Sequence, residues 1–267
     1  MTRFLYGGHI GPEQPRLHYL RYGGEGPPLI LVPGITSPAI TWGFVAEHLG
    51  AANDVYVLDT RGRGLSGTAP DGDYGLEAYA DDVLRLAAGL NLDRFALLGH
   101  SMGARIGLRL SETHRNRLTS LVLVDPPLSG PGRTPYAPQL SWYIDSIRLA
   151  QRGTTADAMR SYLPGWAEQH LHLRAEWLHT CDEDAITASY HNLQNEDILR
   201  SFTTVPETTL LVIAGAAGVI TARDAAEIRG LNPAIAIRTV EGAGHMIPWD
   251  KPKEFYAALH GFVPGIQ

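Results

Sequence analysis

The sequence predicts an α/β fold with a mostly parallel sheet of about eight strands, flanked by helices and carrying one helical insertion. Short, wholly apolar runs alternate with helical patterns in the first half of the chain, as is typical of strands buried on both faces of a sheet. Residues 128–202 then show helical patterns without a strong strand pattern, and strands resume after them. A chain of 267 residues can bury one large core. We therefore expect one core domain, residues 1–127 and 203–267, with residues 128–202 forming a helical lid.

Each predicted strand of the first half stops at glycine, proline or aspartate, residues that favour turns, and those at residues 28–32 and 55–58 are continuous apolar runs. We expect these strands at residues 17–22, 28–32, 55–58, 94–98 and 121–124. Apolar residues at helical spacing predict a helix over residues 76–90, and a second helix follows Ser101 to about residue 111.

The insertion has helical patterns at residues 139–150, 155–162, 169–179 and 184–193. Strands are predicted again at residues 209–214 and 235–240, and a C-terminal helix begins near Lys253. A helical insertion between strands usually covers the carboxyl edge of the sheet, where ligands bind in open α/β folds.

Composition narrows the classes of function. The chain is 44% hydrophobic and 19% charged, which is typical of a globular protein. Its net charge is −6 with scattered Lys and Arg, which argues against a nucleic-acid partner. No apolar run is long enough for a signal peptide or a membrane span, and Cys181 is the single cysteine. We therefore expect a cytoplasmic protein without a disulfide, in which Cys181 lies in a helix and serves packing.

The strongest motif is G-H-S-M-G, residues 99–103, which matches G-x-S-x-G between a predicted strand and a predicted helix. The glycines permit a sharp turn that lifts the serine hydroxyl above the sheet, and the helix directs backbone N–H groups at the site. This context predicts Ser101 as a nucleophile.

A serine nucleophile needs a base, and His245 follows the last predicted strand in the glycine-rich sequence V-E-G-A-G-H-M. His170 and His172 have the wrong spacing for a shared helix face, and no H-E-x-x-H occurs, so we expect neither a metal site nor a cofactor. The oxyanion donors are predicted to be the backbone N–H groups of Met102, next to the nucleophile, and Ile35, in the loop after an early strand.

The triad acid requires a choice between two aspartates. Residues 215–220, which follow the strand at 209–214, contain no carboxylate, and Asp224 lies farther on, at the start of the next helix. Asp125 directly follows the preceding strand, and two prolines after it restrict its loop. We therefore favour Asp125 over Asp224 as the group that holds the histidine tautomer.

Together the motifs P-G-I-T, D-T-R-G-R-G-L-S, G-H-S-M-G, V-L-V-D-P-P and G-A-G-H-M resemble the α/β-hydrolase superfamily over essentially the whole chain. The stretches VPGITSPAITWGFVAEHL, VDPPLSGPGR, WYIDSIR, RAEWLHTC and AGHMIPWD look like the bacterial N-formylmaleamate deformylases of nicotinic acid degradation. This resemblance implies a triad of Ser101, Asp125 and His245. It also implies hydrolysis of N-formylmaleamate to maleamate and formate through a formyl-enzyme.

A substrate with a carboxylate needs a cation, and the lid offers candidates. Arg174 shares a helical stripe with Leu171 and Leu178, so it is expected to face inward, either toward the substrate or as a cover for apolar surface. Trp142 and Trp177 are expected to wall the pocket. The weaker candidate cations are Arg133, Arg148 and His179. The arginines of D-T-R-G-R-G-L-S are expected to hold loops rather than substrate.

Other functions on this fold are limited by the same residues. A serine at position 101 excludes an epoxide hydrolase or dehalogenase, which needs a carboxylate there, and a lipase would show a more extensive apolar lid. An enol-lactonase, a carbon–carbon bond hydrolase and an acylaminomethylene-succinate-type amidase stay open because they can use this triad. A hydrolase-fold protein that binds without turnover stays open too. The expected partner is a small anionic amide, and the oligomeric state is not predicted.

Overall fold

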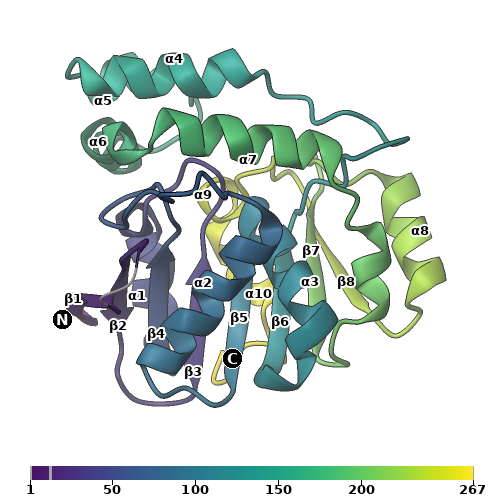
Figure 1. Cartoon of the computed structure of the whole chain (residues 1–267). Coiled ribbons are helices and arrows are strands. Elements are labelled where there is room, and N and C mark those ends of the chain that lie inside the picture. Colours follow the sequence, from purple (N-terminus) through teal and green to yellow (C-terminus); the bar gives the residue numbers. More distant parts are fainter. Residues whose placement is uncertain (1, 12–13, 267) are drawn as a thin grey trace.

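The computed structural model describes residues 2–11 and 14–266, in which an eight-stranded sheet lies between two layers of helices (Figure 1). The strand order is β1-β2-β4-β3-β5-β6-β7-β8. Strands β3 to β8 run parallel, whereas β2 is antiparallel to both β1 and β4. The strands are β1 (Phe4–Ile10), β2 (Leu17–Tyr22), β3 (Pro28–Val32), β4 (Asp54–Asp59), β5 (Phe95–His100), β6 (Leu118–Val124), β7 (Thr209–Ala214) and β8 (Ala236–Val240). The predicted fold class is confirmed.

Neighbouring residues along each central strand enter two different apolar cores, because side chains alternate across a sheet. Ile30 belongs to the core under α2 (Leu76–Gly89), α3 (Met102–His114) and α8 (Ala222–Leu231). Leu31 belongs to the core under α1 (Gly43–Leu49) and α10 (Pro252–Ala258), which lie behind the sheet in Figure 1. Burial on both faces explains why these strands are continuous apolar runs.

Four helices between β6 and β7 lie over the carboxyl edge of the sheet, and we call them the cap helices (Figure 1). They are α4 (Leu140–Gln151), α5 (Ala156–Arg160), α6 (Glu168–Trp177) and α7 (Glu183–Asn195). Their apolar residues continue the core on the α2–α3 face, with Ile147, Leu171 and Ile186 wholly buried. Cap and sheet are therefore joined by one continuous apolar cluster.

Short elements complete the chain. The 3₁₀ turns are η1 (Ala39–Trp42), η2 (Arg115–Arg117), η3 (Leu178–Thr180) and η4 (Leu199–Thr203), and α9 (Ile247–Asp250) precedes α10. Cys181 is buried just after η3 rather than in a helix, which corrects that expectation. Within the described residues, no helix is long and apolar enough to cross a membrane.

Candidate active site

Ser101 occupies a strained turn between β5 and α3. Its φ of 55° and ψ of −115° lie in a region that non-glycine residues rarely adopt. A Cβ on Gly99 would lie 2.2 Å from the carbonyl oxygen of Gly103, so the turn needs glycine there. The Ser101 N–H donates to the carbonyl oxygen of Val124, at 2.9 Å, which ties the turn to the end of β6. The strain places the hydroxyl at the sheet edge.

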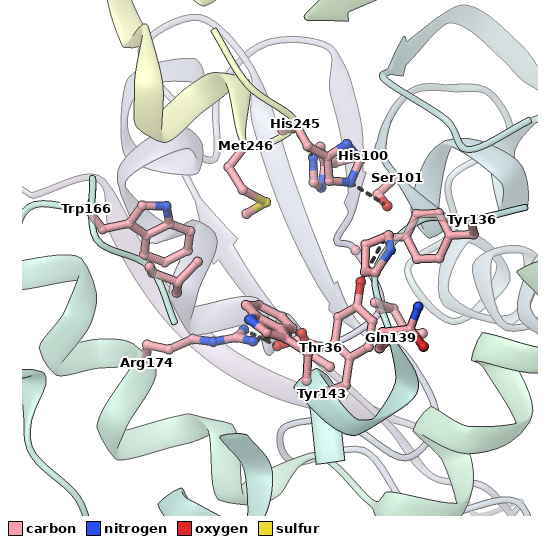
Figure 2. Close-up of a pocket in the computed structure, with 15 residues that line it drawn as sticks. Thr36, His100, Ser101, Tyr136, Gln139, Tyr143, Trp166, Arg174, His245 and Met246 are labelled. Atoms are coloured by element: carbon pink, nitrogen blue, oxygen red, sulfur yellow. Dashed lines mark hydrogen bonds between the residues drawn. The ribbon is translucent and has the colours of Figure 1, made fainter. Parts of the chain in front are cut away.

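His245 connects the serine to an aspartate. The Ser101 hydroxyl lies 3.0 Å from His245 Nε2, and His245 Nδ1 lies 2.7 Å from Asp125 Oδ2 (Figure 2 shows the first of these bonds). A carboxylate only accepts, so Nδ1 carries the proton and Nε2 is left free to accept from the serine. The structure thus brings together the three residues predicted as a triad.

Asp125 is held by the neighbouring loop. It follows β6 directly with a φ of 44°, and its side chain is fully buried. The loop after β7, which lacks a carboxylate, supplies a backbone donor instead: the Val219 N–H lies 3.0 Å from Asp125 Oδ2. The alternative Asp224 is excluded by its position, because it caps α8 through Thr221 and is paired with Arg133 at 2.7 Å.

Two backbone N–H groups beside Ser101 have no acceptor among the described residues. Ile35 and Met102 are both buried, and neither of their N–H groups donates a hydrogen bond to a described residue. Ile35 lines the same cavity as Ser101. Buried N–H groups are rarely left unpaired, so this pair is available to a ligand oxygen.

His100 holds the backbone of His245 in place. Its Nε2–H donates to the His245 carbonyl oxygen at 3.0 Å. Burial, with a further contribution from His245, lowers the pKa of His100 to about 3. His100 is therefore neutral at physiological pH, and it positions His245 without adding a positive charge beside it.

A cavity of about 420 Å³ opens onto the triad, within the range of small-molecule sites. Its wall is mostly apolar and aromatic, with contributions from Trp142, Tyr143, Leu163, Trp166 and Met246. Figure 2 shows Ser101 and His245 together, with Arg174 entering the cavity apart from them. The cavity therefore has two polar regions separated by apolar wall.

Arg174 carries the cationic region. Its guanidinium, on α6, donates to the Thr36 carbonyl oxygen at 2.5 Å and to Thr36 Oγ1 at 2.8 Å. In residues 2–11 and 14–266 it forms no ion pair with a carboxylate, and burial lowers its pKa. A guanidinium nevertheless stays charged in proteins. The cavity thus contains a buried cation without an anion.

Comparison with known proteins places this geometry in a family. The model of the alpha/beta hydrolase family matches residues 29–259. The N-formylmaleamate deformylase of Pseudomonas putida is 53% identical over 263 residues, 98% of each chain. The chain belongs to the α/β-hydrolase family.

Two solved structures of α/β hydrolases extend this likeness. The crystal structure of an N-formylmaleamic acid deformylase from another Pseudomonas putida strain has a TM-score of 0.90 and 48% identity, and the match covers 95% of this chain and 100% of that one. An E-2-(acetamidomethylene)succinate hydrolase has a TM-score of 0.79 and 22% identity over 97% of this chain and 99% of that one. The second likeness shows the fold alone.

Not every lid residue expected at the pocket of this hydrolase lies there. Trp142 lines the cavity, but Trp177 is half-buried at the end of α6 and does not line it. The wall position belongs to Trp166, which precedes α6 and stacks on Trp249 at 4.9 Å between ring centroids. Arg133 is also outside the cavity, because Asp224 and Glu227 of α8 bind its guanidinium.

The two weaker candidate cations are outside the cavity as well. Arg148 is paired with Glu183 on the surface, and His179 is exposed beside a separate shallow pocket. Arg174 is therefore the predicted cation that the structure places in the cavity of this hydrolase.

Two tyrosines at the cavity were missed by the sequence reasoning. The hydroxyls of Tyr136 and Tyr143 lie 2.8 Å apart, and both rings line the cavity. Burial raises the pKa of Tyr136, and the neighbouring hydroxyls of Tyr143 and Ser101 partly lower it. Tyr136 is thus a neutral phenol in the same cavity as Ser101. It lies in the irregular segment between β6 and α4, where no periodic pattern marks a residue as inward-facing.

Proposed function

We propose that this α/β hydrolase removes the formyl group of N-formylmaleamate, giving formate and maleamate. The choice of substrate rests on one feature of the cavity. Arg174 is a buried cation without an anion, and it lies in the same apolar cavity as a hydrogen-bonded triad. An anionic ligand offsets the cost of burying that charge. The full-length relative at 53% identity is named for this reaction, which supports the same choice.

The geometry supports acyl transfer in two halves. Ser101 Oγ attacks the formyl carbon while His245 Nε2 takes the hydroxyl proton, and Asp125 stabilises the imidazolium that forms. The oxyanion accepts from the N–H groups of Ile35 and Met102. His245 then gives its proton to the leaving nitrogen, and the C–N bond breaks to release maleamate. Water, activated by the same histidine, hydrolyses the formyl ester to formate and restores Ser101.

The substrate carries two carbonyls on one nitrogen, so its orientation decides the products. Arg174 lies apart from Ser101 in the cavity (Figure 2), so a carboxylate bound to Arg174 would hold the maleamyl part away from Ser101 and leave the formyl carbon at the nucleophile. Attack at the other carbonyl would give maleate and formamide instead.

Proton NMR of the reaction mixture tests the proposal, because maleamate, maleate, formate and formamide give separate signals. Purified protein and its Ser101→Ala variant are incubated with N-formylmaleamate in parallel. We expect formate and maleamate in equal amounts from the unaltered protein, and only the uncatalysed background from the variant. Maleate with formamide, or no reaction above background, would overturn the proposal.

A further inference from the structure

We propose that Arg63 is a positioning residue that holds the oxyanion hole in place and connects it to cap helix α7. This inference rests on the oxyanion role of Ile35 and Met102 in the proposed reaction. Arg63 lies in the loop after β4, outside the cavity that holds the triad.

The burial of Arg63 has no electrostatic partner to explain it. Its side chain is wholly inaccessible to solvent, and no carboxylate in residues 2–11 and 14–266 forms an ion pair with it. Arg61, two residues earlier, differs: it is paired with the buried Asp82 at 2.7 Å. Burying an arginine without an anion costs free energy, so its hydrogen bonds must offset that cost.

On the core side, Arg63 contacts both residues assigned to the oxyanion hole. Its Nε–H donates to the Ile35 carbonyl oxygen at 3.0 Å, and one terminal nitrogen lies 4.0 Å from Met102 Sδ. A second nitrogen donates to the Arg61 carbonyl oxygen at 2.7 Å, which fixes the guanidinium to its own loop.

On the cap side, the same guanidinium reaches α7. It donates to Ser189 Oγ at 2.8 Å and approaches the Ala185 carbonyl oxygen at 3.4 Å. Tyr79 on α2 completes the network, since its hydroxyl accepts from Arg63 and lies 2.8 Å from Ser189 Oγ. One planar group thus joins the oxyanion loop, the core helix α2 and the cap.

The oxyanion loop needs such support because Gly34 precedes Ile35. Glycine has the widest backbone freedom, so the direction of the Ile35 N–H is not set by local sterics. Arg63 fixes the Ile35 carbonyl, and Arg174 fixes that of Thr36. A preorganised donor accelerates acyl transfer without reorganisation during the reaction, and loss of one costs about 10²–10³-fold in kcat.

The experiment compares Arg63→Met, Arg63→Lys and Ser189→Ala with the unaltered protein. Each is assayed with N-formylmaleamate and with p-nitrophenyl acetate, an ester that needs the oxyanion hole but has no carboxylate for Arg174. The inhibition constant of maleamate reports ground-state binding. Phe255→Leu, in the buried part of α10, is the control for lost stability without contact to the loop.

We expect Arg63→Met to lower kcat by about 10²-fold on both substrates, with KM and the maleamate constant changed less than about threefold. Arg63→Lys should recover part of kcat, and Ser189→Ala should lower it by about two- to tenfold. If Arg63→Met does not fold, Arg63→Lys and Ser189→Ala test the inference instead, through a lower kcat with nearly unchanged KM and maleamate inhibition constant.

The inference would be overturned if the Arg63 and Ser189 variants kept a kcat as high as that of Phe255→Leu when compared at an equal loss of Tm. A fall in kcat/KM that comes only from KM would also overturn it. Failure of the deformylase proposal is recognised separately. The unaltered protein would then hydrolyse p-nitrophenyl acetate but release no formate from N-formylmaleamate, and the rates on p-nitrophenyl acetate would still report on Arg63.

Discussion

Arg174→Met provides the sharpest test of how the substrate is recognised. Methionine has a similar length to arginine. The replacement removes a charge that is paired with no carboxylate among the described residues. Loss of one partner of a buried ion pair costs about 3–5 kcal/mol. Taking 3–4 kcal/mol, kcat/KM for N-formylmaleamate should fall by about 10²–10³-fold, since 1.4 kcal/mol is a factor of ten.

Arg174 also holds Thr36, beside the oxyanion loop, so the two effects have to be separated. N-formylacrylamide keeps the formyl amide and the double bond but lacks the carboxylate. The ratio of kcat/KM for the two substrates isolates recognition of the carboxylate, while the fall for the neutral substrate measures the effect on the loop. Thr36→Val removes the hydroxyl acceptor and keeps the cation, so it should preserve the ratio.

The thermal stability of the Arg174→Met variant supplies an independent test. In the absence of substrate, Arg174 is a buried charge without a counter-ion, so Arg174→Met should keep or raise Tm. Equal loss of kcat/KM on the charged and neutral substrates would refute the assignment of Arg174 as the carboxylate partner.

Three further predictions concern the triad and its surroundings. Asp125→Asn should lower kcat by about 10⁴-fold because it removes the acceptor that fixes the His245 tautomer; steady-state formate release measures this, and a loss under tenfold would contradict it. Tyr136→Phe should lower kcat by about three- to tenfold, because it removes a hydroxyl of the cavity wall that bonds Tyr143 in the same cavity as Ser101, and an unchanged kcat in the same assay would contradict this prediction. His100→Gln should flatten the dependence of stability on pH. The folded pKa of His100, about 3, lies below its ordinary value of 6.5, so the unfolded chain takes up the proton first as pH falls. The contribution of His100 is complete above about pH 6.5, and roughly 2 kcal/mol of it is lost by about pH 5. Urea titrations of both proteins across this range test the sign, and parallel curves would contradict it.

The sequence was sufficient for the parts of the fold where local pattern and burial agree. The strands β2, β3 and β7 have the predicted bounds: β3 and β7 are nearly continuous apolar runs, and β2 ends where the glycine-rich turn at Gly23 begins. Strand β1 was not predicted, because its residues Phe4, Leu5 and Tyr6 are exposed and two glycines follow, so it lacks an apolar alternation. Helix α1 was missed for a similar reason, since it begins at a glycine and is short.

At the site, the sequence predicted the residues that follow strand ends and missed those that lie in irregular segments of the cap. Ser101, Asp125 and His245 follow the ends of neighbouring parallel strands, and such ends meet at one edge of the sheet. Tyr136 and Trp166 lie in irregular cap segments, where neither period applies. The contacts of Arg63 join three segments distant in sequence, which no local pattern can indicate.

Trapping of the acyl-enzyme with hydroxylamine tests the central claim, that Ser101 takes up the formyl group, most directly. Turnover of N-formylmaleamate in the presence of hydroxylamine divides the acyl-enzyme between water and the added nucleophile. We predict formohydroxamate in proportion to the hydroxylamine concentration, with none above background from Ser101→Ala. Maleamyl hydroxamate, or equal formohydroxamate from the Ser101→Ala variant, would contradict the claim.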